Sequence, residues 1–313
     1  MEHLSHLHAL LSEGRFVVTA ELGPPKSGSP KPLRRAAAAL AGHVDAVNVT
    51  DNQAAVVRLC SLAACVHIMA EGIEPVLHMT CRDRNRIGLQ SDLLGAYSLG
   101  VRNVLALTGD HPSLGNHPDA RPVFELDSTE LCGVLRRMRD TGCFMNGEPC
   151  KPAPRFHIGV GENPFAVTAE YSALRLAQKV AAGADFVQTQ PVYDLDRFAE
   201  WMSVLARMGL EKRVAVIAGV LPVRSHSALE RMAKVPGLHV PEAVFHRFKG
   251  LTAEQQQAEG VRLAVETVAG LRKIAGVHGV HIMAINWPEA VPEIVSLTGL
   301  LPRPAVSVAD SDS

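Results

Sequence analysis

Glu21 is the residue whose type and position most clearly suggest chemistry, because it lies inside an apolar, β-rich run, "VVTAELGPP". A lone carboxylate is costly to bury in a strand unless it is paired or used. Burial is expected to raise its pKa, and a raised pKa suits a general acid near neutral pH. We therefore predict that Glu21 transfers a proton in an active site.

Asp110 raises a related question, because it stands where the stretch "LALTGDHPSLGNHP" (105–118) changes from an apolar run into a loop of Gly, Pro and His. Other apolar runs also stop at polar side chains. These residues are Thr50, Asp51 and Asn52; His78, Thr80, Arg82 and Asp83; Thr108; Gly161, Glu162 and Asn163; Gln188, Thr189 and Gln190; and Asn286 and Trp287. Asp, Asn and Thr also cap helices well, so about half of this set is expected to be structural.

The elements that must position these residues alternate between short β-rich runs and stretches with helical spacing. The β-rich runs cover 16–22, 44–50, 75–81, 103–109, 155–161, 185–190, 213–219 and 279–285. Eight strand–helix units predict an α/β fold of the (β/α)8 TIM-barrel type rather than an open doubly wound sheet. In such a barrel the carboxyl ends of the strands meet at one mouth, so the polar residues are expected to converge there.

The chain has 313 residues, more than the roughly 250 of a plain barrel, which leaves room for insertions. The clearest insertion, 111–127, follows the fourth strand, and a second, 235–270, follows the seventh. No stretch has the composition of an interdomain linker, so 1–303 is predicted to form one barrel domain. The small, acidic segment 304–313 is predicted to be a disordered tail.

Composition argues against several classes of function. The net charge is −1, so the chain lacks the basic footprint of a nucleic-acid-binding protein. No apolar run reaches the roughly 18 residues of a membrane span, and no signal peptide is evident, which predicts a cytoplasmic protein. The six cysteines form no CxxC pair, so we expect reduced thiols and no metal site. Neither GxGxxG nor GxxxxGK[ST] occurs, which leaves a Rossmann nucleotide site unsupported.

A barrel can still bind phosphate through loop amides, helix N-termini and basic side chains. Lys179, in the predicted helix after the fifth strand, is one candidate cation, and Arg82 and Arg84, after the third strand, are two more. For a single lysine, a solvated position on a helix surface is at least as common as a ligand contact.

Eight short pieces occur in order along the chain. They are "TAELGPPK", "VDAVNVTDN", "HMTCRDRNRIGLQSDLLGAYSLGVRNVLALTGD", "HPDARPVFELDS", "GVGENPF", "KVAAGADFVQTQPVYD", "IAGVLPV" and "HIMAINW". In this combination the sequence resembles the methylenetetrahydrofolate reductase family over about 20–300. The variant pieces "CRDRNR", "GDHP…LDS" and "ENPF" look closest to a bacterial sub-branch of one-carbon and demethylation metabolism.

The resemblance implies a flavoprotein that holds FAD at the barrel mouth and interconverts 5,10-methylene- and 5-methyltetrahydrofolate, with a hydride passing from NADH or NADPH through the flavin. In the matching positions, Glu21 is the general acid, Asp110 lies near flavin and pterin, and Gln190 bonds the pterin edge. The resemblance implies substrate binding by Gln190, Tyr193, Asp110 and Trp287, and cofactor binding by Thr50, Asn52, His78, Arg82, Thr108, Asp110, Asp127, Gly161, Asn163 and Lys179.

The sequence departs from the best-known members of that family at four places. Thr108 stands where they have an arginine, Trp287 replaces a basic residue, and Met232 aligns with an aromatic one. Of an aromatic-rich stretch after "TQ", only Tyr193 is kept. These changes touch the surface on which nicotinamide and folate would stack, so they bear on the electron donor more than on the folate.

Two alternatives to the nicotinamide-driven reaction stay open, and a third is disfavoured. The same folate chemistry could exchange electrons with a partner protein, or the barrel could be a flavin-free folate one-carbon binding protein. An aldolase or lyase with an active-site lysine is disfavoured, because none of the eight β-rich runs contains a lysine. The sequence sets neither the direction of the reaction nor the oligomeric state, and a homo-oligomer is compatible with it.

Overall fold

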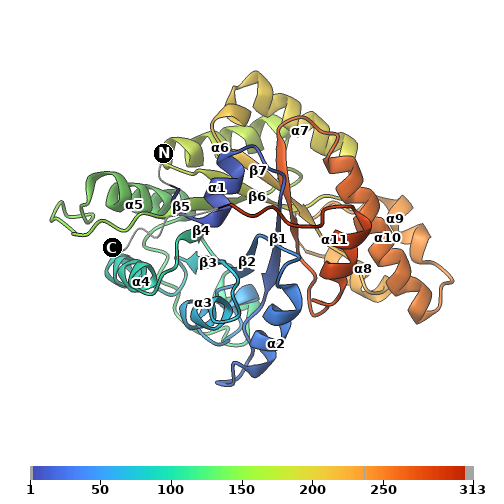
Figure 1. Ribbon diagram of the computed structural model, residues 1–313, viewed down its shortest axis with the longest axis horizontal. Helices are drawn as coiled ribbons and strands as arrows, with labels where there is room; N and C mark the ends of the chain where they lie inside the picture. The colour runs from blue at the N-terminus through green and yellow to red at the C-terminus, as the bar shows by residue number, and fades with distance from the viewer. Residues whose placement is uncertain (1–2, 236, 307–313) are drawn as a thin grey trace.

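The computed structural model describes residues 3–235 and 237–306. Eight parallel strands pair in chain order, and the last pairs with the first to close a barrel (Figure 1). The strands are β1 (Val17–Leu22), β2 (Ala46–Val49), β3 (Pro75–Thr80), β4 (Asn103–Leu107), β5 (His157–Glu162), β6 (Phe186–Pro191), β7 (Ala215–Val220) and β8 (Val277–Ile282). The predicted (β/α)8 TIM barrel is confirmed, and each strand overlaps the run that predicted it.

Helices surround the ring of strands (Figure 1). They are α1 (His6–Ser12), α2 (Lys31–Leu40), α3 (Ser61–Met69), α4 (Arg86–Ser98), α5 (Ser128–Thr141), α6 (Ala169–Ala182), α7 (Leu195–Arg207), α8 (His226–Ala233), α9 (Glu242–Phe248), α10 (Ala253–Leu271) and α11 (Ala290–Leu297). Short 3-10 helices are η1 (Gln53–Ala55), η2 (Pro112–Leu114) and η3 (Leu210–Lys212). None of the helices in the described ranges is long and apolar enough to cross a membrane.

The two predicted insertions differ in structure. Segment 111–127 contains η2 and otherwise follows an irregular path from β4 to α5. After β7 the chain forms α8, α9 and α10 before it enters β8. Helix α10 packs against β7, β8 and α11, so it is the crossover helix of the barrel, and the extra elements are α8 and α9. Only 304–306 of the predicted tail are described, and Val306 packs against the apolar cluster at the bottom of the barrel.

The barrel interior is divided into an apolar and a polar layer. At the N-terminal end, α1 lies across the ring of strands and inserts Leu7 and Leu10 (Figure 1). They pack in one cluster with the strand side chains Val17, Ala46, Val76, Leu105, Phe186 and Ile217. The polar layer consists of the buried residues Thr19, Asn48, His78, Gln188 and His281.

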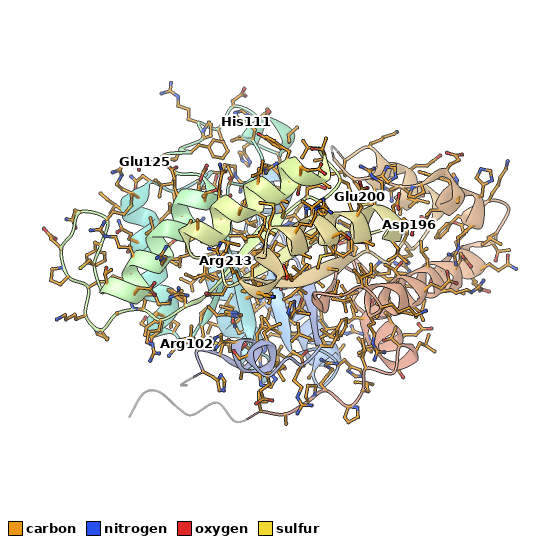
Figure 2. The ribbon with its side chains drawn as sticks, turned by 90° about the horizontal axis from the view of Figure 1, so that it is seen from above. Arg102, His111, Glu125, Asp196, Glu200 and Arg213 are labelled. Carbon is orange, nitrogen blue, oxygen red and sulfur yellow. The ribbon has the colours of Figure 1, made fainter. Side chains whose placement is uncertain are left out.

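The barrel axis is upright in Figure 2, which fixes the direction of the mouth. Arg102, just before β4, lies near the lower edge, whereas His111, four residues after β4, lies at the upper edge. The carboxyl ends of the strands therefore open upward in this view, away from α1, and any site at the mouth is built on the polar layer.

Candidate functional site

A cavity of about 500 Å³ opens at the carboxyl ends of the strands. This volume lies within the range of small-molecule sites, roughly 300–1,000 Å³. Of the fourteen residues that the resemblance assigned to the site, eleven line it: Glu21, Thr50, Asn52, His78, Arg82, Thr108, Asp110, Gly161, Asn163, Lys179 and Gln190. The structure thus brings together side chains from β1 to β6 and their loops, as expected for a barrel mouth.

The side chain of Glu21 lies in the cavity wall, is 13% exposed and has two polar neighbours. Gln53 Nε2 donates a hydrogen bond to Glu21 Oε1 at 3.2 Å, and His281 Nε2 lies 3.8 Å from Glu21 Oε2. The second separation suits an ion pair better than a hydrogen bond.

The predicted rise in the pKa of Glu21 is wrong. Burial does act to raise this pKa, but the polar contact and charge of His281 and the Gln53 hydrogen bond together hold it below the ordinary value. The prediction considered burial alone, whereas the fold supplies partners that stabilise the carboxylate.

The polar layer below Glu21 is a connected hydrogen-bond network. His281 Nδ1 lies 2.9 Å from Thr19 Oγ1, which accepts a bond from Gln188 Nε2 at 3.3 Å. Gln188 and Asn48 exchange two hydrogen bonds, and Asn48 Nδ2 donates to His78 Nε2 at 2.8 Å. Since an amide NH2 can only donate, His78 Nε2 must accept and the ring is neutral. Burial accordingly lowers the pKa of His78 to about 4.

A second network links the loops after β2, β3 and β4. Asp51 is buried and accepts hydrogen bonds from Thr80 and from Arg84, whose NH1 lies 2.7 Å from Oδ2. These partners lower the pKa of Asp51 although burial opposes them. Arg82 donates to the carbonyls of Asn52 and Asp110 at 3.3 Å each and pairs with Asp83. Arg82 therefore holds two loops of the mouth together.

The loop after β4 is attached to the loop after β2. Asn116 Oδ1 accepts a hydrogen bond from Val57 N at 3.1 Å, and at Gly115 the backbone passes so close to Ala55 O that a Cβ would not fit. Residues 52, 54 and 55 all have left-handed backbone angles without being glycine. Such conformations are strained and persist where the surroundings enforce them, often at functional sites.

Lys179 is not a solvated helix charge. Its side chain is 7% exposed, and its Nζ lies 2.8 Å from Glu162 Oε2 and donates to Gly161 O at 2.6 Å. The Glu162 carboxylate is fully buried, so the pair is a desolvated ion pair that joins α6 to the end of β5.

Three predicted site residues lie away from the cavity. Asp127 forms the capping box of α5 with Glu130, and Tyr193 is partly buried with its hydroxyl donating to Leu221 O at 3.1 Å. Trp287 packs against the main hydrophobic core. Met232, which aligns with an aromatic residue of the best-known members, lies in α8 outside the cavity wall. The resemblance placed these residues by sequence alone, and local capping and packing account for the first three.

Four cavity residues or partners escaped the sequence reasoning: His281, Asn48, Gln53 and Arg175. A usable signal existed for the first two. In a strand, alternate residues share a face, and Thr19 and Glu21 on β1 are two apart, as are His281 and Met283 at the end of β8. Polar residues inside an apolar strand, and not only those at its end, therefore indicate which face of the strand points into the barrel.

The fold and the cavity define a TIM barrel with a polar ligand site at its mouth. The model of the family "Methylenetetrahydrofolate reductase" matches residues 6–299, which is almost the whole chain. The protein therefore belongs to the methylenetetrahydrofolate reductase family.

Curated relatives are similar at a moderate level. A fission yeast (Schizosaccharomyces pombe) methylenetetrahydrofolate reductase 1 is 28% identical over 77% of this chain and 38% of its own length. The 5,10-methylenetetrahydrofolate reductase of Salmonella typhimurium is 27% identical over 74% of this chain and 72% of its own. The chain thus spans about two fifths of the yeast relative and most of the bacterial one.

Among solved structures, a protein from Clostridium thermocellum described as binding two copies of 5-methyl-5,6,7,8-tetrahydrofolic acid superposes with a TM-score of 0.66. The alignment covers 95% of this chain and all of that one at 12% identity. The superposition shows that the two proteins share a fold, and at this identity it shows nothing further.

Proposed function

We propose that this protein is an FAD-dependent 5,10-methylenetetrahydrofolate reductase that interconverts 5,10-methylene- and 5-methyltetrahydrofolate, with NADH or NADPH as the electron donor. The observation that carries the proposal is the meeting of Glu21, Asp110 and Gln190 in one cavity of a barrel from this family. Curated relatives with this name and a structural neighbour that binds methyltetrahydrofolate support the same chemistry.

The lining of the cavity suits a flavin. Thr50 Oγ1 is buried at the cavity without a hydrogen-bond partner among the described residues, and a buried polar atom of this kind normally has one. A ligand with hydrogen-bonding edges would supply it. Thr50, His78, Thr108, the backbone at Gly161 and Lys179 would hold the cofactor, which supplies the hydride chemistry when bound.

Asp110 and Gln190 would orient the folate. A pterin presents an amide and an amino group along one edge, and a carboxylate and a carboxamide can pair with such an edge. Both side chains are exposed at the cavity, so they are free to turn toward a ligand.

Glu21 would hold and deliver the proton that opening of the folate imidazolidine ring requires. In the free protein its neighbours favour the carboxylate. Glu21 would therefore take up a proton from solvent in each turnover and pass it to the folate. His281 Nε2, 3.8 Å away, orients the carboxyl and balances its charge.

The decisive experiment is an anaerobic titration of the purified protein, loaded with FAD, with NADH, NADPH and methyltetrahydrofolate in separate runs. Bleaching of the flavin by methyltetrahydrofolate and by one nicotinamide is the expected result. Bleaching by methyltetrahydrofolate alone would indicate that a partner protein, and not a nicotinamide, exchanges electrons with the flavin. Protein that binds no FAD, or whose flavin ignores methyltetrahydrofolate, would contradict the proposal.

A further inference from the structure

Glu21 lies between two cavities. Besides the cavity at the mouth, a second cavity of about 290 Å³, here called the side cavity, lies between α2 and the loops after β1, β2 and β8. Among the described residues, Glu21 and Gln53 line both cavities, and the hydrogen bond from Gln53 Nε2 to Glu21 Oε1 joins their side chains. Glu21 therefore stands in the wall that separates the two spaces.

The side cavity reaches solvent without passing through the mouth. Four residues that line it are exposed, namely Gly23, Pro32, Ile285 and Asn286. None of these four lines the cavity at the mouth. A ligand that fills the mouth cavity therefore leaves this opening, between α2 and the loop after β8, accessible to water.

Polar groups in the side cavity can hold water. Arg58 Nε is buried there and has no hydrogen-bond partner among the described residues, whereas Arg58 NH1 donates to Pro24 O at 3.1 Å. Glu21, Gln53 and Asn286 bring further polar groups, and the rest of the lining is apolar. A water molecule in a protein cavity typically bonds to two to four polar groups, and a buried polar atom normally has a partner.

The loop after β2 places the two basic and amide groups of this route. Asn52 Oδ1 accepts a hydrogen bond from Arg58 N at 3.0 Å, and the strained backbone at residues 52, 54 and 55 surrounds Gln53. The loop thus directs Gln53 toward the Glu21 carboxyl group and Arg58 into the side cavity.

The proposed reaction makes such a route necessary. The neighbours of Glu21 hold its pKa below the ordinary value, so the free protein carries a carboxylate at this position. A cofactor and a folate that fill the mouth cavity expel water from it. A proton that Glu21 delivers must then come from another side.

We propose that the side cavity is the route by which protons pass between solvent and Glu21 while the mouth cavity is occupied, a role that rests on the proposed function. A proton from an acid in bulk solvent moves through water in the side cavity and forms an O–H bond with the Glu21 carboxylate. That bond breaks when the proton passes to the folate nitrogen whose bond to carbon opens. No electrons move with the proton, and the reverse reaction returns it by the same path. Gln53 and Arg58 are positioning residues.

Ala36→Leu tests the route, because Ala36 lines the side cavity from α2 and leucine is a good helix former. The larger side chain is expected to displace water and to slow the folate half-reaction about tenfold, which is within the contribution of a general acid. The ratio of the rates in H2O and D2O should rise, because proton uptake becomes limiting. Stopped-flow mixing of FAD-loaded, dithionite-reduced protein with saturating methylenetetrahydrofolate measures both. Reduction of the oxidised flavin by a nicotinamide should stay unchanged.

Ala38→Leu is the matched control, since it makes the same substitution at an exposed position of the same helix that lines neither cavity. Ala36→Ser leaves the side cavity open to water. Both variants should keep the wild-type rate and isotope ratio. Arg58→Met removes a group that bonds water, and it should slow the folate half-reaction about threefold with a raised isotope ratio.

Three results would overturn the proposal. The first is a wild-type isotope ratio in both Ala36→Leu and Arg58→Met, with thermal unfolding showing that both are folded. The second is a raised Kd for methyltetrahydrofolate in Ala36→Leu with an unchanged isotope ratio, which would assign the side cavity to part of the folate. The third is an equal loss in Ala38→Leu, which would reflect the helix. If methylenetetrahydrofolate does not reoxidise the wild-type flavin, the proposed function itself fails, so the two failures are distinguishable.

Discussion

The two ends of the barrel solve opposite problems. At the N-terminal end, Leu7 and Leu10 of α1 are completely buried against the strands. The first amides of α1 donate to the Glu74 carboxylate at 2.7 and 2.9 Å, so these two amides are paired. At the mouth, a cavity of about 500 Å³ stays open, a buried hydroxyl lacks a partner, and several carboxylates face one space. The N-terminal end is packed for stability, whereas the mouth has polar groups that a ligand can bind.

Backbone strain follows the same division. The non-glycine residues with left-handed backbone angles, within the described part of the chain, are Asn52, Ala54, Ala55, Phe124 and Asn286, and all lie in loops that follow strands at the mouth. The turns that lead into strands at the opposite end use glycine for this conformation, as at Gly14 and Gly100. Glycine adopts it without steric cost, whereas the other residues need surroundings that enforce it.

The largest expected effect is at the mouth. Glu21→Gln should slow the folate half-reaction by about 10²- to 10⁴-fold, because the amide cannot deliver the proton. Reduction of the flavin by a nicotinamide needs no proton from Glu21 and should stay nearly unchanged. Stopped-flow measurement of the two half-reactions separates these effects. An equal loss in both would mean that Glu21 is structural.

Leu10→Ala probes the opposite end. Deleting a fully buried leucine side chain is expected to lower the free energy of unfolding by about 2–5 kcal/mol. Denaturant unfolding measures this loss, and the Kd for FAD should not change, because α1 lies at the far end of the barrel. A large change in flavin affinity would contradict the separation of the two ends.

Acid should weaken the protein through buried neutral histidines at both ends. Burial lowers the pKa of His78 at the mouth to about 4, and that of His157 at the bottom well below its ordinary value. A lowered histidine pKa gives stability that is present above the unfolded pKa and is lost as the pH falls toward the folded one. For His78 alone, the loss between about pH 7 and pH 5 is about 2 kcal/mol.

Urea unfolding at both pH values checks this loss, and His78→Gln should remove its share while the share of His157 persists. Glu74 acts in the opposite direction, because burial raises its pKa and protonation then favours the folded state. A pH slope that His78→Gln leaves unaltered would assign the acid sensitivity to other groups.

The smallest expected effect on stability and on flavin binding is at the Thr50 hydroxyl, which has no hydrogen-bond partner among the described residues. Thr50→Val has nearly the same shape and removes a buried polar atom without a partner, so the free energy of unfolding should stay within about 1 kcal/mol or rise. The Kd for FAD should increase about fivefold if the flavin supplies the missing partner. Thermal unfolding of the apo-protein and flavin titration measure the two quantities. A marked loss of stability would show that the hydroxyl is already satisfied in the apo-protein.

Much of this arrangement was predictable from the sequence. The eight β-rich runs correspond to β1–β8, and eleven of the predicted site residues line one cavity. The prediction worked where the signal was local, because an apolar run marks a strand and its polar end marks the mouth. It was wrong for the pKa of Glu21, since the partners that lower it come from distant segments, on β8 and in the loop after β2.

By itself the sequence determined the order of strands and helices, the face on which the polar residues emerge, and the family. Those properties depend on periodicity, capping and short motifs that neighbouring residues carry. Only the tertiary structure decided which charges remain available. Glu162 on β5 neutralises Lys179 on α6. The guanidinium of Arg82 is bonded to the carbonyls of two loops, whereas Arg175 lines the cavity. Whether a charge binds a ligand depends on the partners that the closed barrel brings within about 4 Å, and no local pattern encodes those distances.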